Sequence, residues 1–338
     1  VIWLFIFGPL KSKQRSSSSN TQEQTTGSES ENIYMKYLLF DIQYNEQFFK
    51  QFAGALFFLS QSINNKCTLV LPHFRSLPKD DNNYTIRNSD NYGYHPWERF
   101  YDLEKIKSAY KVISIDEFSK LNLEIDLLCS KTDMFIKDDT ILISNIPIKF
   151  KKRERNTAYN YANELKSNNV VAICGTTNQL PFSVQTYKVL RKNIKYHDYL
   201  YDTVDNFLKS KNIDKYISVH WRQTDFISVR GARSDVLRTV EQVVEKCKEH
   251  MKNYNINHVY IATDSKDKVK LKYLEDNLPL FKFDIEDEVL NEKYMFAVIE
   301  SIICAKAEHF YGTYTSLYSI NICGERLILN KPHDQIFL

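Results

Sequence analysis

Residues Tyr216 to Phe226 read YISVHWRQTDF and are the most informative segment of this chain. Its first part is typical of a buried β-strand that ends after His220, where Arg222 and Asp225 follow. In an open α/β sheet, ligands bind beyond the carboxyl ends of the strands. Charged side chains at this position are poorly placed for packing in the core but well placed to bind a ligand. A guanidinium is a permanent cation that can hold two phosphate oxygens at once. We therefore predict that Arg222 binds a phosphate group of a ligand. The alternative is that Arg222 forms a structural ion pair at the strand end.

Short β-rich runs alternate with longer helical runs on both sides of this stretch, which is typical of α/β layering. In the N-terminal half we expect strands at Tyr37 to Ile42, Cys67 to Leu71 and Val170 to Cys174, and helices at Gln47 to Asn64 and Ile115 to Leu128. In the C-terminal half we expect strands at Tyr216 to His220, His258 to Ala262 and His309 to Tyr311, and helices at Val189 to Phe207, Asp235 to Tyr254, Asp267 to Asn277 and Glu292 to Ala307. Because each half repeats the strand-to-helix order, we predict two Rossmann-like domains, residues 36–200 and 201–338, that face each other across a cleft.

The composition describes a globular chain without a strong bulk charge. Of the 338 residues, 43% are hydrophobic and 26% are charged, and 45 Lys plus Arg against 42 Asp plus Glu leave a formal net charge of +3. This balance argues against a nucleic-acid partner or a membrane-binding surface. An anionic ligand would therefore have to be bound by a few basic residues close to its site. The length also exceeds what one core usually serves, which agrees with two domains.

The six cysteines show no spacing that is typical of a zinc site, so we expect no metal there. An even number permits up to three disulfides in an oxidising compartment. Several of them lie in apolar runs, where a cysteine can equally be a small buried hydrophobic residue. The cysteines are Cys67, Cys129, Cys174, Cys247, Cys304 and Cys323.

The first ten residues, VIWLFIFGPL, are almost wholly apolar and precede basic residues and a polar run from Ser16 to Glu31. Ten residues are too few to span a bilayer. We interpret residues 1–35 as the remnant of a signal peptide or signal anchor and a flexible stem, with a stray hydrophobic terminus as the alternative. The glycosylation sequon at Asn83 favours the same interpretation. We therefore expect a protein of the secretory pathway lumen, in the endoplasmic reticulum or the Golgi, that touches membranes only through such an anchor.

Polar residues also follow the next two expected strands. Asp264 and Ser265 come after His258 to Ala262, where a carboxylate suits a ribose hydroxyl or a purine base, although helix capping is the alternative. The run from Gly312 to Ser319 offers hydroxyls and backbone N–H groups at the start of a helix, which suits phosphate oxygens. Three consecutive strand ends with such chemistry together predict one ligand site.

Several motifs, in order and approximate spacing, resemble those of the GDP-fucose protein O-fucosyltransferases. In the C-terminal half they are HWRQTDF from His220, VYIATDS from Val259, ICAKAEHFYGT from Ile303, and Ser316 to Ser319 followed by Gly324-Glu325-Arg326. YLLFD from Tyr37, LVLP from Leu69 and PWERFYDL from Pro96 resemble the branch that modifies thrombospondin type 1 repeats, whereas FAGALFF from Phe52 and YKVISIDEF from Tyr110 resemble the branch that modifies EGF-like repeats. The likeness covers residues 36–330.

This resemblance implies a GT-B-type α/β fold and a GDP-fucose site held mainly by the C-terminal domain, with no metal and no other cofactor. It also implies inverting transfer of fucose to a Ser or Thr hydroxyl of a folded acceptor domain, while Arg222 neutralises the charge that grows on the departing β-phosphate. The donor-site residues that it implies are His220, Arg222, Asp225, Asp264, Ser265, Ser316, Leu317 and Tyr318. For His220, which stands on the expected strand beside Trp221, a core residue is the alternative.

Glu46 stands where the thrombospondin-repeat branch carries a glutamate thought to be the general base, a role that suits a carboxylate in a partly desolvated cleft. A solvated loop glutamate is the alternative. The sequence departs from the family at Gln47 and Phe49, which replace Gly and Asn, at Leu317, which replaces a hydroxyl residue, and at Asn321, where one branch has Arg. A glycan-directed α-1,6-type fucosyltransferase, and a sugar-nucleotide-binding protein without turnover, are therefore two further hypotheses.

Overall fold

The computed structural model describes residues 35–42, 47–76, 93–130, 132–133, 135–155, 161–176, 184–224, 226–227, 237–284, 287–290, 292–332 and 336–337. Residues 36–338 belong to one compact unit. Among the described residues, no helix has both the length and the apolar character that a membrane span requires. The predicted boundary between two domains near residue 200 stays a prediction, although the described strands do form separate sheets before and after it.

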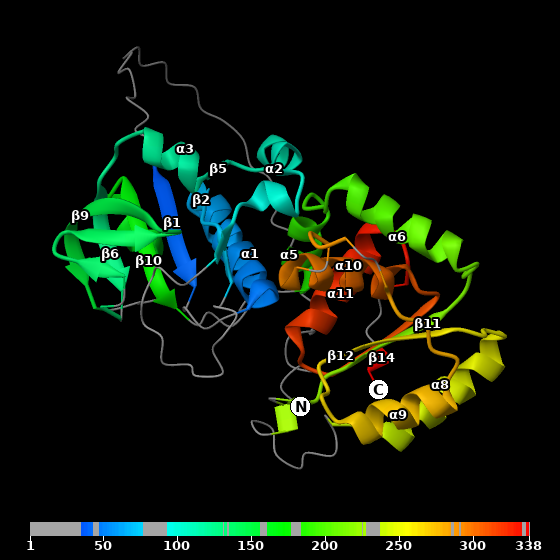
Figure 1. Cartoon of the computed structure of the whole chain (residues 1–338). Helices are drawn as coiled ribbons and strands as arrows, with labels where there is room; N and C mark the ends of the chain where they lie inside the picture. Colours follow the sequence, from blue (N-terminus) through cyan, green and yellow to red (C-terminus); the bar gives the residue numbers. More distant parts are fainter. Residues whose placement is uncertain are drawn as a thin grey trace, which may run out of the picture. The chain divides into compact units, whose positions relative to one another are not determined.

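The first large sheet collects most strands of the N-terminal half, in the order β5-β2-β1-β10-β6-β9-β8-β7 (Figure 1), and β3 and β4 pair in a small sheet of their own. Its strands are β1 (Tyr37–Ile42), β2 (Thr68–Leu71), β5 (Val112–Ser114), β6 (Ile125–Ser130), β7 (Ile136–Lys137), β8 (Thr140–Ile143), β9 (Ile146–Glu154) and β10 (Val170–Thr176). Neighbours from β5 to β9 pair in parallel. Central parallel strands are buried on both faces, which explains why β1, β2 and β10 are apolar runs. The three strands predicted here are confirmed.

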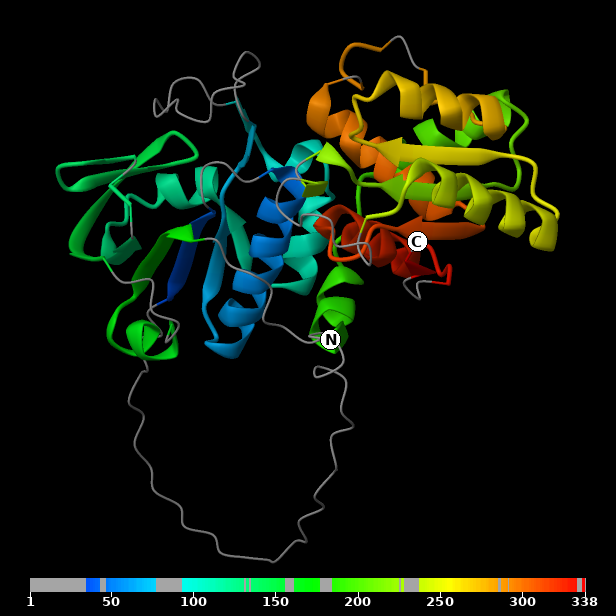
Figure 2. The same cartoon turned by 90° about the horizontal axis from the view of Figure 1, so that it is seen from below.

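The predicted helix from Ile115 to Leu128 is wrong in its second half. Helix α3 (Ile115–Lys120) begins with a capping box between Ser114 and Glu117 and gives way at Asn122, whose φ of 52° is left-handed. The apolar residues that follow form strand β6, which pairs with β10 and β9. The antiparallel strands β7 and β8 extend the sheet beyond β9, seen in green at its edge in Figure 2, and were not predicted.

Helix α1 (Phe48–Asn64) packs against the first sheet through an aromatic face. Phe48, Phe52 and Phe58 are buried, and the rings of Phe40 and Phe58 stack with their centroids 4.6 Å apart. Each such ring contributes about 1.5 to 3 kcal/mol on burial. The other described elements of this half are β3 (Phe74–Ser76), β4 (Gly93–His95), the 3-10 helix η3 (Trp97–Arg99), α2 (Leu103–Ala109), α4 (Tyr161–Ser167) and α5 (Val184–Arg191).

The second sheet has the order β12-β11-β13-β14, and all its pairs are parallel. Its strands are β11 (Ile217–Trp221), β12 (Val259–Thr263), β13 (His309–Gly312) and β14 (Ile336–Phe337). Its helices are α6 (Asp198–Ser210), α8 (Val240–Tyr254), α9 (Lys268–Asn277), α10 (Lys293–Lys306) and α11 (Leu317–Ile328). Helices α8 and α9 lie on one face of this sheet and α6 and α10 on the other (Figure 1).

The strands and helices predicted for this half are confirmed, with differences at their ends. Helix α8 begins at Val240, where Thr239 and Gln242 form a capping box that fixes its start, and the predicted start at Asp235 lies outside the described residues. The helical segments predicted from Val189 to Phe207 are the two helices α5 and α6, and the chain between them adopts a turn.

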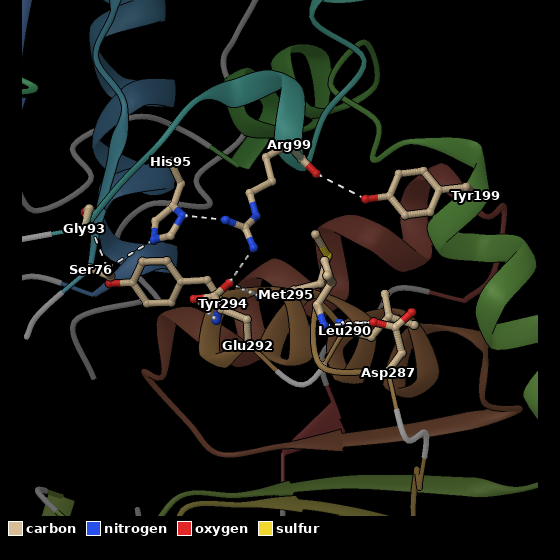
Figure 3. A network of polar contacts seen from close by, with 11 residues as sticks. Ser76, Gly93, His95, Arg99, Tyr199, Asp287, Leu290, Glu292, Tyr294 and Met295 are labelled. Carbon is tan, nitrogen blue, oxygen red and sulfur yellow. Dashed lines mark hydrogen bonds and ion pairs between the residues drawn. The ribbon is translucent and has the colours of Figure 1, made fainter. Parts of the chain in front are cut away.

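A polar network joins helix α10 to strand β4 and helix η3 (Figure 3). His95 lies between Ser76, at 3.1 Å, and Arg99, at 3.0 Å, and Arg99 reaches Glu292 at 3.4 Å. Tyr294 donates a hydrogen bond of 2.8 Å to the backbone carbonyl of Arg75. These contacts fix the N-terminal end of α10 against the N-terminal half of the chain.

All six cysteines are free and buried. Cys129 and Cys174 lie in strands of the first sheet and Cys67 directly precedes β2, whereas the other three lie in helices α8, α10 and α11. Of the two possibilities left open for the cysteines, the structure thus shows small buried residues rather than disulfides.

Candidate active site

The carboxyl ends of β11, β12 and β13 meet at one edge of the second sheet. Trp221 is the register partner of Thr263, and hydroxyl hydrogen bonds of 2.7 Å tie the neighbouring strands to β11. One runs from Thr263 to the carbonyl of Trp221, and the other runs from Thr313 to the carbonyl of His220. The three strand ends that the sequence singled out are therefore brought together.

Arg222 and Asp264 form an ion pair at this edge. The Arg222 Nη1 atom lies 3.1 Å from Asp264 Oδ2, and the Arg222 backbone N–H donates to Thr313 Oγ1 at 3.0 Å. Asp264 also accepts from the backbone N–H of Gln223 at 2.7 Å and from the Thr224 hydroxyl. The ion pair that was the alternative for Arg222 is thus observed, while the guanidinium remains partly exposed and its binding of a phosphate stays a prediction.

The capping alternative for Asp264 is wrong, because Asp267 is the N-cap residue of α9 and accepts from Val269 and Lys270. Ser265 lies beside it, where its hydroxyl accepts from the Asp267 N–H at 3.3 Å and its own N–H donates to Thr263. Ser265 therefore shapes the turn that presents Asp264.

His220 is buried beneath this edge rather than displayed on it, with 4% of its surface exposed. Burial, together with the nearby positive charge of Arg222, lowers the pKa of His220 to about 3. Its Nδ1 atom shares a hydrogen bond of 2.7 Å with the hydroxyl of Ser319, which also accepts the Thr313 N–H at 3.0 Å. His220 is therefore neutral at physiological pH and positions the start of α11.

The turn from Gly312 to Leu317 brings the chain from β13 into α11. Gly312 lets this turn approach closely, since a Cβ atom there would lie 2.8 Å from the Ser319 side chain. Thr315 adopts a left-handed φ of 64°, which is strained for a β-branched residue. Its hydroxyl is buried and has no hydrogen-bond partner among the described residues. Ser316 is the buried N-cap residue and Leu317 is partly exposed, so hydroxyls and N–H groups gather at this helix start.

Tyr318 directs its hydroxyl inward, away from the turn. It donates to Glu300 Oε2 at 3.0 Å and to the carbonyl of Ala297 at 3.2 Å. Its ring makes edge contacts with His220 and with Phe49, each at a centroid distance of 4.7 Å. Phe49, one of the departures from the family, thus gives α1 an aromatic contact with this turn.

Two predicted site residues, Glu46 and Asp225, lie outside the described residues. Asn321 is buried and donates to the Tyr196 hydroxyl at 3.1 Å, so it is a packing residue in this structure. The Glu325-Arg326 motif is also internal: Glu325 pairs with Arg191, and Arg326 donates to backbone carbonyls that include Ala307.

Sequence reasoning missed Glu300 and assigned no individual role to Thr313 and Ser319. The latter two lie within a run that was recognised only as a hydroxyl-rich turn. Glu300 had a signal, since it is an acidic residue inside the apolar run AVIESIICA of α10. Among the residues that the structure describes, no group of three or more His, Cys, Asp or Glu side chains is placed to hold a metal ion.

The comparisons with known proteins agree with this geometry. The chain is 37% identical over 116 residues to the human GDP-fucose protein O-fucosyltransferase 2, covering 34% of this chain and 26% of that protein. It is 30% identical over 125 residues to the Caenorhabditis elegans protein of the same name, covering 36% and 28%. The matched segments thus span about a quarter of the length of these relatives.

Solved structures of fucosyltransferases share the fold. POFUT1 in complex with GDP-fucose superposes with a TM-score of 0.63 at 14% identity, covering 90% of this chain and 97% of that one. NodZ α-1,6-fucosyltransferase soaked with GDP-fucose gives a TM-score of 0.52 at 15% identity, covering 87% and 92%. The predicted GT-B-type α/β fold is confirmed. Residues 46–329 match the family described as GDP-fucose protein O-fucosyltransferase, and the chain therefore belongs to that family.

Proposed function

We propose that this protein transfers fucose from GDP-fucose to a Ser or Thr hydroxyl of a folded acceptor domain, a thrombospondin type 1 repeat or an EGF-like repeat. The observation that carries the proposal is the edge of the second sheet, where Arg222 and Asp264 meet the hydroxyl-rich start of α11. A cation beside a helix N-terminus suits a diphosphate. A carboxylate at the next strand end suits a ribose or a base.

In the proposed reaction the acceptor hydroxyl oxygen attacks the anomeric carbon of fucose from the face opposite the diphosphate. The bond from that carbon to the β-phosphate oxygen breaks, GDP leaves, and the anomeric configuration inverts. Arg222 stabilises the negative charge that grows on the departing diphosphate, a role for which the reaction needs no divalent metal. Glu46 receives the acceptor proton. His220 is unsuited to this step because its pKa is lowered to about 3.

We further propose that the protein acts in the lumen of the endoplasmic reticulum, and that it meets membranes only through an N-terminal anchor. Folded acceptor domains of these two kinds occur in secreted chains, which supports that compartment. The donor is the soluble GDP-fucose, and no other cofactor takes part.

The direct test is transfer from labelled GDP-fucose to folded thrombospondin type 1 and EGF-like repeats in the presence of a chelator. We expect label on one repeat type, and Arg222→Ala is expected to abolish it. A core N-glycan supplied in competition distinguishes a glycan-directed enzyme, which would label the glycan instead. Binding of GDP-fucose without transfer to either repeat or to the glycan would favour a binding protein, and absence of both binding and transfer would refute the proposal.

A further inference from the structure

Glu300 is an acidic residue enclosed between two tyrosine hydroxyls. It lies on α10, directly after the fully buried residues Val298 and Ile299, and its own side chain is partly buried. Its Oε2 atom accepts from the Tyr318 hydroxyl at 3.0 Å and its Oε1 atom from the Tyr260 hydroxyl at 3.3 Å. The carboxylate therefore joins strand β12 to the first turn of α11.

These contacts bear directly on the candidate donor site. The ring of Tyr318 makes edge contacts with both His220 and Phe49. His220 in turn holds the hydroxyl of Ser319, one residue after Tyr318. A contact that holds the Tyr318 ring in place therefore also holds the turn that starts α11. Glu300 makes such a contact through the Tyr318 hydroxyl.

We propose that Glu300 is a positioning residue: as a carboxylate it holds Tyr318 in place and so preforms the turn that receives the donor diphosphate. The inference rests on the proposed function, because it assumes that GDP-fucose binds at this turn. It assigns Glu300 no contact with the donor and no part in the transfer of the fucosyl group.

The environment of Glu300 makes this role sensitive to pH. Burial raises the pKa of Glu300 to about 7, although its bonds from Tyr318 and Tyr260 oppose that shift. The other titratable groups close to it are the two tyrosines and Cys304, and burial raises the pKa of each well above its ordinary value. These three stay neutral between pH 5 and 8, and so does His220, whose pKa is lowered to about 3. Glu300 is therefore the group of this cluster that titrates near neutrality.

The sign of the effect follows from the chemistry of a carboxyl group. The ionised carboxylate accepts from both phenols, whereas the protonated acid carries a proton on one oxygen and loses acceptor capacity there. The hydrogen bond between Glu300 and Tyr318 then joins two neutral groups and is weaker than the charge-assisted bond, so the turn loosens. Donor binding is accordingly strongest above pH 7 and weakens as the pH falls through the pKa of Glu300.

The test measures the dissociation constant of GDP-fucose by calorimetry between pH 5.5 and 8.5, without acceptor. GDP-fucose is the probe, rather than GDP, because its diphosphate is esterified at both ends and has no terminal ionisation in this range. For the wild type we expect binding to weaken about tenfold from pH 8 to pH 5.5, the effect of losing one charge-assisted hydrogen bond. Glu300→Gln is expected to bind at all pH values as weakly as the wild type does at pH 5.5.

Two further variants separate positioning from folding. Tyr318→Phe keeps the ring and the carboxylate but removes the linking hydroxyl, and it is expected to lose the pH dependence as Glu300→Gln does. Glu292→Gln makes the same chemical change at the N-cap of α10, where the side chain caps the helix and pairs with Arg99, and it is expected to keep the wild-type profile. In the transfer assay, Glu300→Gln should raise KM for GDP-fucose about tenfold and leave kcat within about twofold.

The outcomes are distinguishable. A wild type that binds no GDP-fucose at any pH contradicts the proposed function and this inference with it. A wild type that binds, while Glu300→Gln and Tyr318→Phe bind equally well with the same pH profile, overturns the inference alone. If Glu300→Gln fails to fold by circular dichroism, Tyr318→Phe decides between these outcomes.

Discussion

The Nη1 atom of Arg222 lies 3.1 Å from the Oδ2 atom of Asp264, across two neighbouring strands of the second sheet, and the two side chains are 25% and 24% exposed. Asp264 is itself held by the Gln223 N–H and by the Thr224 hydroxyl. The carboxylate is therefore a fixed anchor that orients the guanidinium before any ligand arrives. Preorganisation of this kind places a cation where charge will develop without reorganisation during the reaction.

Replacing Arg222 tests the proposed role of its guanidinium. Arg222→Ala is expected to lower kcat for fucose transfer by at least about a thousandfold, because the departing diphosphate loses its cation. Arg222→Lys keeps the charge but loses the planar fork, so we expect an intermediate loss. The control is Arg155→Ala, an arginine of the first half that is 76% exposed and pairs with Asp133. Near-normal turnover in folded Arg222→Ala would remove Arg222 from the mechanism.

Replacing Asp264 tests the anchor rather than the cation. Asp264→Asn keeps the shape of the side chain but removes the charge that orients Arg222, so kcat/KM is expected to fall about tenfold to a hundredfold, as for loss of a charge-assisted hydrogen bond. Asp267→Asn, at the N-cap of the following helix, is the matched control and should leave transfer unchanged. Equal activity of the two variants would mean that the ion pair serves only the fold.

The buried His220 predicts how stability depends on pH. Its pKa is about 3 in the folded protein, because burial disfavours the charged ring, and close to 6.5 in the unfolded chain. Between these values the unfolded chain binds more protons, so the contribution is complete above pH 6.5 and is lost as the pH falls. From pH 7 to pH 5 this one group should lower the free energy of unfolding by about 2 kcal/mol.

His220→Gln isolates this effect from the other titrating groups, which are common to both proteins. Urea unfolding of the two proteins at pH 7 and at pH 5 is the measurement. The wild type should lose about 2 kcal/mol more than His220→Gln between these two pH values. Parallel losses in both proteins would show that the ring is not buried in its neutral form.

The ion pair between Arg191 and Glu325 predicts a large coupling energy. Both side chains are fully buried, and Tyr201 also donates to the Glu325 carboxylate. Arg191→Met leaves a carboxylate without its cation and is expected to lower the free energy of unfolding by about 3 to 5 kcal/mol. The double variant Arg191→Met/Glu325→Met should be more stable than the sum of the single effects predicts, because neither charge remains.

Chemical unfolding of the single and double variants measures this coupling. The exposed pair of Lys272 and Asp276, at 2.6 Å on α9, provides the contrast, since Lys272→Met should change stability by less than about 1 kcal/mol. Additive effects at Arg191 and Glu325 would contradict a direct charge interaction.

The fold was predictable where the burial pattern is unambiguous. Strands β1, β2, β10 and β11 to β13 are apolar runs bounded by polar residues, and each was recognised. The segment after Ile115 was not, because its apolar spacing suits a helix equally well, and only the left-handed Asn122 and the pairing of β6 with β10 decide the outcome. Such pairings join residues far apart in the sequence and leave no local pattern.

In the candidate site, too, some features follow from the local sequence pattern and others depend on packing between distant segments. Arg222 and Asp264 were predictable because parallel strands place their carboxyl ends at one edge, whatever the details of packing. The inward direction of the Tyr318 hydroxyl, and its meeting with Glu300 and Tyr260, depends on the rotation of α10 against the sheet. That rotation is set by the whole core, and residue spacing alone does not contain it.

The free cysteines give each part of the chain its own chemical reporter. Burial raises the pKa of Cys67 and Cys129 to about 11 and that of Cys247 and Cys323 to about 12. Since the thiolate is the reactive form, an alkylating reagent modifies these residues only in molecules that have opened. Three thiols belong to the N-terminal half and three to the C-terminal half. Mass spectrometry of the alkylated protein over time therefore shows whether all six thiols react together or one set of three reacts first, that is, whether the two halves open together or in sequence.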